Sequence, residues 1–199
     1  MARAARLLVA LGLVLSLPIA SAAGQGLPAW ARFLGGAASS ILAHEAAHVT
    51  AAALMGGSPS FGFDRGRPVV YSGITTGVHP HRQFVFSASG MSMQLLLNEV
   101  ILDWPQEEGE RAGAFERGLL AGGVVTVLFY FTIGRTATVS DVTQMAQYSG
   151  LSRWSLVAIF GGVAATDVVR IVLRDRYGPH FFALPGPDRT LRLGASAAF

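Results

Sequence analysis

Two histidines and a glutamate stand in the order His44-Glu45-Ala46-Ala47-His48. Residues four apart lie one above the other on the same face of an α-helix, so both imidazoles can bind one metal ion. Zinc in hydrolytic sites is held by neutral imidazoles and a carboxylate, with a fourth position open for water. Glu45 is offset by one residue and stands beside such an ion, where it can accept a proton from an activated water molecule. The pattern therefore predicts a zinc site at His44 and His48 with Glu45 as general base.

The surroundings of these residues favour a metal ion. They lie in an apolar stretch, residues 33–57, whose neighbouring segments offer no compensating charge. Ionisable side chains in an apolar helix are costly unless they pair or bind an ion, and a bound cation removes that cost. The alternative interpretation is a pair of core histidines with a buried acid, which needs no metal.

The composition is typical of a membrane protein. Hydrophobic residues make up 51% of the chain and charged residues 14%, with a mean hydropathy of +0.46, whereas soluble domains carry roughly 25% charged residues. The absence of cysteine excludes disulfides, a cysteine nucleophile and thiolate metal ligands. All fifteen basic residues are arginines scattered along the chain, so we expect no nucleic-acid partner.

Apolar stretches that reach or approach the ~20 residues of a membrane-spanning helix occur at 7–23, 33–57, 84–104, 118–133 and 154–173. We therefore expect an all-α membrane protein, a polytopic helical bundle of four to five spans. Residues 1–23 form either a signal peptide or the first transmembrane span. Residues 24–177 form the functional domain, and residues 178–199, which are rich in Gly and Pro, form an irregular C-terminal tail.

Residues 58–83, between the second and third stretches, differ from the apolar stretches in their residue pattern. Two β-prone runs, Phe61–Phe63 and Pro68–Ile74, are separated by Asp64-Arg65-Gly66. Short β-prone runs joined by turn residues indicate a β-hairpin. We expect a small hairpin inserted between the metal helix and the next span.

Together these features resemble the site-2 protease family of intramembrane zinc metallopeptidases, and in particular a small bacterial branch of it. That family has the HExxH helix in a membrane span, a hairpin after it, and a later span with Gly-Pro-x-x-Asn, where this chain has Gly90-Met91-Ser92-Met93-Gln94. The branch also carries Ser-Asp, then Ser-Gly, then an aromatic residue, which matches Ser140-Asp141, Ser149-Gly150 and Trp154. The resemblance covers roughly residues 33–173.

The resemblance implies a zinc-dependent protease in a bacterial inner membrane. It would hydrolyse peptide bonds of membrane proteins or peptides in the lipid bilayer. Asp141 would be the third metal ligand, provided that Ser140 takes the N-cap of the following helix and leaves the aspartate free.

Three alternatives stay open. Glu99 and Asp103 have the Glu-x-x-x-Asp spacing of gluzincin-type membrane peptidases, which makes Glu99 a competitor of Asp141. The chain can also be a non-catalytic membrane protein that binds or transports a metal. Gln94 either forms interhelical hydrogen bonds or donates to a substrate carbonyl or oxyanion.

Overall fold

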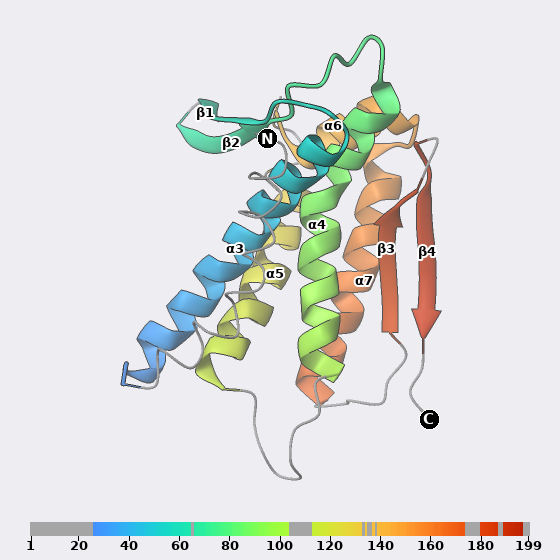
Figure 1. Ribbon diagram of the computed structural model, residues 1–199. Coiled ribbons are helices and arrows are strands. Elements are labelled where there is room, and N and C mark those ends of the chain that lie inside the picture. The colour runs from blue at the N-terminus through green and yellow to red at the C-terminus, as the bar shows by residue number, and fades with distance from the viewer. Residues whose placement is uncertain are drawn as a thin grey trace.

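The computed structural model describes residues 26–64, 66–103, 113–132, 134, 137, 139–173, 180–186 and 189–196. Over these residues the chain is mostly helical, with α3 (Ala29–Leu54), α4 (Pro80–Asp103), α5 (Ala114–Thr132), α6 (Asp141–Ser149) and α7 (Arg153–Leu173). Two antiparallel hairpins join β1 (Ser60–Asp64) to β2 (Arg67–Tyr71) and β3 (His180–Pro185) to β4 (Leu191–Ser196). The four long helices pack together, and the β1–β2 hairpin and α6 lie at the same end of the bundle (Figure 1).

Three of the described helices, α4, α5 and α7, are long and apolar enough to cross a membrane, which is consistent with a membrane protein. The expected four to five spans are therefore too many for this part of the chain. α3 has the length, at 26 residues, but its buried face consists of small residues and histidines instead of large aliphatic ones. The apolar stretch 7–23 lies outside the described residues, so both of its interpretations stay predictions.

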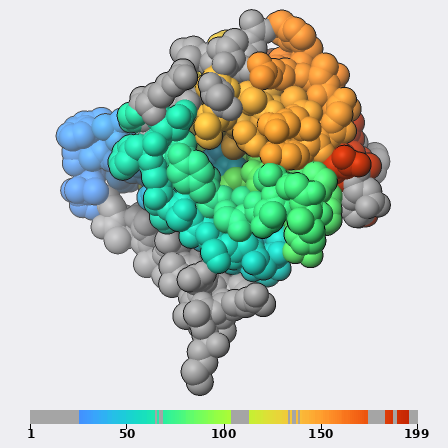
Figure 2. Space-filling model, turned by 90° about the horizontal axis from the view of Figure 1, so that it is seen from above, coloured from blue at the N-terminus to red at the C-terminus, as the bar shows by residue number. Residues whose placement is uncertain are grey.

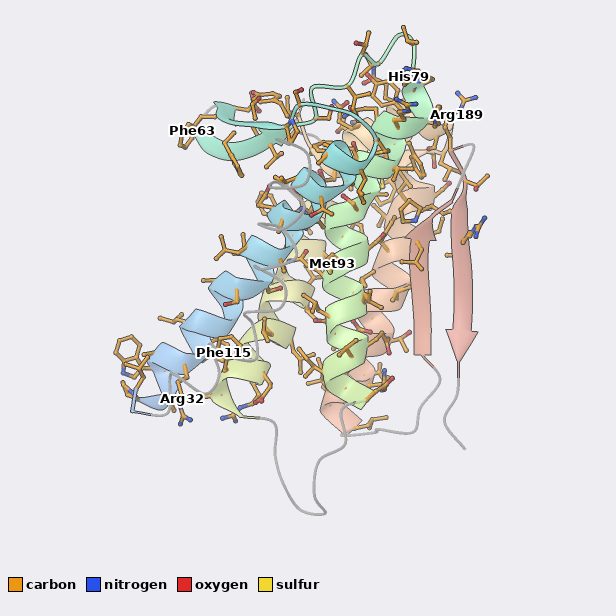
Figure 3. The ribbon with its side chains drawn as sticks, viewed as in Figure 1. Arg32, Phe63, His79, Met93, Phe115 and Arg189 are labelled. Carbon is orange, nitrogen blue, oxygen red and sulfur yellow. The ribbon has the colours of Figure 1, made fainter. Side chains whose placement is uncertain are left out.

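Glycines let α3 and α5 approach each other closely. A Cβ atom added at Gly36 would collide with the backbone of Phe115, and one added at Gly118 would collide with the backbone of Phe33. Figure 3 shows Arg32 and Phe115 together at the end of the bundle away from the β1–β2 hairpin. Small residues at a helix interface allow the backbone contact that holds membrane helices together. This packing fixes α3, and with it His44 and His48, against the rest of the bundle.

α4 is the central helix, because it contacts the other four described helices and β3. Its apolar residues Phe84, Ala88, Met91 and Leu95 are at most 1% exposed and belong to the core, together with residues of α5, α6 and α7. Gly90, which lies between Ala88 and Met91 in the sequence, faces α3. α4 therefore supplies both the core and one wall of the site.

The hairpin expected within residues 58–83 is confirmed. β1 and β2 pair with Ser60 opposite Tyr71 and Asp64 opposite Arg67. Gly66 has a φ of +80°, a left-handed conformation that glycine adopts readily and that the tight turn requires.

The irregular C-terminal tail was a wrong expectation, because residues 180–185 and 191–196 pair as the β3–β4 hairpin. Pro185 ends β3, and Gly186 begins the connection toward β4. The hairpin packs beside α4 and α7, and the Ser92 hydroxyl donates a hydrogen bond of 3.0 Å to the Ala183 carbonyl.

Candidate metal centre

One ligand atom from each of His44, His48 and Asp141 converges on a single point. Asp141 Oδ2 lies 3.0 Å from His44 Nε2 and 3.3 Å from His48 Nε2, and the two Nε2 atoms are 3.1 Å apart. In a tetrahedral zinc site with bonds of about 2.0–2.1 Å, neighbouring ligand atoms are about 3.3–3.4 Å apart. The three residues therefore form a group that can hold one small metal ion, with a fourth coordination position left over.

Two helices far apart in the sequence supply these side chains. His44 and His48 lie one turn apart on α3 and are 1% and 3% exposed. Asp141 begins α6, and the residue before it, Ser140, is the N-cap, with its side chain accepting a hydrogen bond from the Thr143 amide. Because Ser140 caps the helix, the Asp141 carboxylate is available to the histidines.

Hydrogen bonds on the far side of each imidazole set its tautomer. His48 Nδ1 donates to the Phe86 carbonyl at 2.7 Å, and His44 Nδ1 donates to Gln94 Oε1 at 2.9 Å. The Gln94 amide nitrogen in turn donates to Ser40 Oγ at 3.3 Å, which fixes the orientation of the amide group. In a neutral imidazole with its proton on Nδ1, Nε2 carries a lone pair and can bind a metal.

Two nitrogen lone pairs and a carboxylate oxygen thus face one another inside the protein. A proton on one nitrogen can bridge only two of these three acceptor atoms, whereas a metal ion can bind all three at once. Burial by itself raises the pKa of the Asp141 carboxyl, but when His48 and His44 carry a proton on the nitrogen that faces it, their charge and hydrogen bonds more than offset burial and hold that pKa well below its usual range. The aspartate is therefore ionised and ready to bind a cation.

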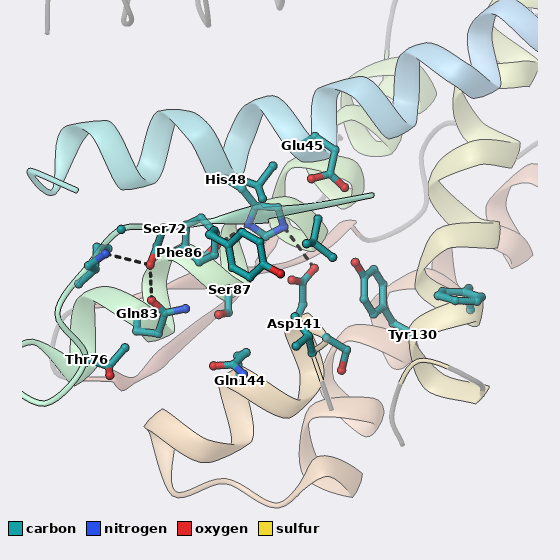
Figure 4. Close-up of a pocket in the computed structure, with 18 residues that line it drawn as sticks. Glu45, His48, Ser72, Thr76, Gln83, Phe86, Ser87, Tyr130, Asp141 and Gln144 are labelled. Carbon is teal, nitrogen blue, oxygen red and sulfur yellow. Dashed lines mark hydrogen bonds and ion pairs between the residues drawn. The ribbon is translucent and has the colours of Figure 1, made fainter. Parts of the chain in front are cut away.

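The group faces a cavity of about 550 Å³, a size that suits a small ligand or a short peptide segment. Its lining includes Glu45 and His48 from α3, Asp141 from α6, residues 69–71 of β2, and the end of α5. Figure 2, viewed from above, shows the surface hollowed between the residues that follow α3 and those of α6 and α7. Figure 4 shows Glu45 on the same cavity as Asp141. Glu45, the predicted base, therefore lines the same cavity as His48 and Asp141, two of the three predicted ligands.

Gln94 lies away from this cavity. It is fully buried, and its amide group is used by His44 and Ser40. Of the two roles considered for it, the structure shows interhelical hydrogen bonding, directed at His44.

Glu99 also lies outside this cavity. Its carboxylate forms an ion pair with Arg170 of α7, and the same guanidinium binds Asp103 at 2.8 Å. Asn98 beside it donates to Asp167 at 2.9 Å. The Glu-x-x-x-Asp spacing of Glu99 and Asp103 thus serves an ion pair between α4 and α7, and Glu99 is absent from the metal-binding group found among the described residues.

Three more residues complete the site, and sequence reasoning assigned none of them a role in it. Tyr130 of α5 stacks on His44, with ring centroids 5.6 Å apart and planes 12° apart. Ser87 lines the cavity, is 1% exposed and has no hydrogen-bond partner among the described groups. Gly90 touches both histidines, because a Cβ atom there would lie 2.5 Å from His44 Nε2 and 2.6 Å from His48 Nε2. The family resemblance was the one signal that singled out Gly90, and none singled out Tyr130.

Comparison of the chain with protein-family models, with curated proteins and with solved structures found no match.

Proposed function

We propose that this protein is a zinc-dependent membrane metallopeptidase. The observation that carries the proposal is the convergence of His44, His48 and Asp141 at the wall of a cavity that Glu45 also lines. Three ligands, an open fourth position and an adjacent carboxylate are the parts that metal-assisted hydrolysis requires.

The donor set supports zinc as the metal. Two imidazoles and one carboxylate suit zinc, and they also suit iron(II) in oxygenases that use the same three ligands. Glu45 favours the hydrolytic metal, because an oxygenase has no need of a carboxylate base one residue from a ligand. Metal content of the purified protein decides between the two.

Within this proposal the chain's own residues have distinct tasks. A zinc ion held by the three ligands would supply Lewis-acid activation of a water molecule. Glu45 accepts the proton as the water oxygen adds to the peptide carbonyl carbon, and then gives that proton to the departing amine. Gln94 and the Phe86 carbonyl keep the imidazoles in the metal-binding tautomer throughout.

The cavity suggests the class of substrate. Residues 69–74, which belong to β2 and the segment after it, line one side, so an extended peptide can lie along them as an added strand. The buried Ser87 hydroxyl offers a hydrogen bond to such a peptide. With the apolar α4, α5 and α7 around the site, we propose membrane proteins or membrane-associated peptides as substrates. We retain the site-2 protease family and a bacterial inner membrane as the setting that the sequence motifs imply.

The decisive experiment exchanges Glu45 for glutamine in the full chain, purified in detergent. Glu45→Gln is nearly isosteric but its amide cannot accept the proton, so we expect about one zinc per chain and a loss of peptide cleavage by ~10²–10⁴-fold. Glu116→Gln makes the same change on α5 outside the cavity and should retain full activity.

Cleavage by the Glu45→Gln variant at the wild-type rate would refute Glu45 as the base. If the wild type binds zinc, cleaves no peptide and carries zinc across vesicle membranes, the non-catalytic transport function replaces the peptidase.

A further inference from the structure

The geometry points to Tyr130 as a further catalytic residue, whose hydroxyl donates a hydrogen bond to the oxygen of the scissile carbonyl as negative charge develops on it. This inference rests on the proposed peptidase function. Tyr130 comes from α5 and lines the cavity together with Glu45 and Asp141. Its hydroxyl lies 3.5 Å from His44 Nε2, a predicted ligand atom.

The ring of Tyr130 is held in place by stacking on the imidazole of His44. Figure 4 shows its hydroxyl pointing toward Asp141. The hydroxyl therefore stands beside the ligand atoms, on the side that faces the cavity. A side chain whose ring is fixed in this way directs its hydroxyl without a large loss of conformational freedom.

The hydrogen bonds of His44 determine how the Tyr130 hydroxyl can interact with a substrate. His44 Nδ1 has its proton directed at Gln94, so Nε2 can only accept, and the Tyr130 hydroxyl is the donor in that contact. His44 Nε2 would use its lone pair to hold a metal ion and would then no longer accept from Tyr130. The hydroxyl, 3.5 Å from that nitrogen, would then lie within reach of a substrate carbonyl oxygen beside the three ligand atoms.

Gln94 is unable to supply this hydrogen bond. In the resembled family the corresponding position is an asparagine, and here the longer amide is fully buried behind His44 with both ends engaged. Tyr130 reaches the metal-binding group from the cavity side instead. The two residues therefore have separate tasks, Gln94 to orient a ligand and Tyr130 to stabilise the oxyanion.

The chemical step requires a hydrogen bond and no transfer of the tyrosine proton. As the water oxygen adds to the carbonyl carbon, the electron pair of the C=O double bond moves to the carbonyl oxygen, and the Tyr130 O–H strengthens its hydrogen bond to that oxygen. Because the bond is stronger in the transition state than in the ground state, its removal lowers kcat more than it raises KM. Loss of one oxyanion donor typically costs ~10²–10³-fold in kcat.

Tyr130→Phe tests the inference, because it keeps the stacked ring and removes only the hydroxyl. Tyr148→Phe is the matched control, since Tyr148 lies on α6 and is absent from the cavity lining. We would measure zinc content, kcat and KM for a fluorogenic peptide, and the Kd of acetohydroxamate, a small metal-binding probe with an anionic oxygen. We expect Tyr130→Phe to keep its zinc, to lose ~10²-fold in kcat at similar KM, and to bind acetohydroxamate about ten- to a hundredfold more weakly.

The outcomes separate this inference from the proposed function. Unchanged kcat and unchanged acetohydroxamate affinity in Tyr130→Phe would overturn the inference while the peptidase stands. Loss of zinc in Tyr130→Phe would also overturn it, because Tyr130 would then be a metal ligand. If the wild type cleaves no peptide, the proposed function fails, and the acetohydroxamate affinities alone then decide whether the Tyr130 hydroxyl serves an oxygen at the metal.

Discussion

One methyl group at position 90 should strongly weaken metal binding. Gly90 of α4 faces the ligand atoms so closely that a Cβ atom would lie 2.5 Å from His44 Nε2 and 2.6 Å from His48 Nε2. Carbon and nitrogen atoms in ordinary contact are about 3.5–4.0 Å apart. Gly90→Ala therefore requires the helix or the two imidazoles to move by about 1 Å.

Hydrogen bonds hold both imidazoles in place, so they cannot move away from an added methyl group without loss. Their Nδ1 atoms are bonded to Gln94 and to the Phe86 carbonyl at 2.9 and 2.7 Å, so a shift of this size breaks these hydrogen bonds as well. Metal–ligand distances tolerate only about 0.2 Å. Since the loss of one outer hydrogen bond already lowers metal affinity by about 10–100-fold, we expect Gly90→Ala to lower it by at least ~100-fold.

The fold should survive the substitution. Overpacking by one methyl group costs about 1–3 kcal/mol, and alanine favours a helix by about 1 kcal/mol over glycine. Gly162→Ala is the matched control, because it adds the same methyl group inside α7 where no atom lies within 4 Å.

Both variants would be compared with the wild type by circular dichroism, by elemental analysis of zinc and by competition with a chelator. Helical content should be the same in all three proteins, and Gly162→Ala should keep its zinc. A Gly90→Ala protein that binds zinc as tightly as the wild type would refute the placement of α4 against the histidines.

Two more substitutions test the rest of the metal centre. Gln94→Leu removes the acceptor of His44 Nδ1 and should weaken zinc binding by about 10–100-fold in a chelator competition; unchanged affinity would mean that His44 needs no hydrogen bond to hold its orientation. Asp141→Ala should lower zinc occupancy and remove activity, whereas Glu99→Ala should keep both and lower the free energy of unfolding by about 3 kcal/mol, because Arg170 loses a buried partner. Zinc loss in Glu99→Ala, with zinc retained in Asp141→Ala, would move the third ligand to Glu99.

The local parts of the site could be predicted because they depend on neighbours in the sequence. The spacing of His44 and His48 determines that they share a helix face, and the structure brings their Nε2 atoms to 3.1 Å. An N-cap is decided within three residues, and Ser140 takes that position, as the aspartate's availability required. The β1–β2 hairpin follows from the turn at Gly66 in the same way.

The other partners could not be predicted because they come from distant segments. Gln94 reaches His44 across 50 residues and Tyr130 reaches it across 86. No local pattern records which residue of one helix stands opposite which residue of another, since this depends on the packing of whole helices. Arg170 shows the same limit, because its partners Glu99 and Asp103 lie about 70 residues away on α4.

Within the described residues the expected count of spans was too high because α3 does not reach the hydropathy of a membrane span. The two faces of α3 differ: its buried residues are small or are metal-binding histidines, whereas its strongly exposed residues include large apolar ones (Trp30, Leu34, Ile41 and Leu42). The mean hydropathy of α3 averages these two faces, so its two histidines and the small residues beside them lower the value. Large exposed apolar side chains indicate a surface that meets lipid or protein, while small residues let α5 approach α3. Contacts with α4 and α5 therefore hold α3 in the bundle, although its hydropathy is lower than that of the three candidate spans.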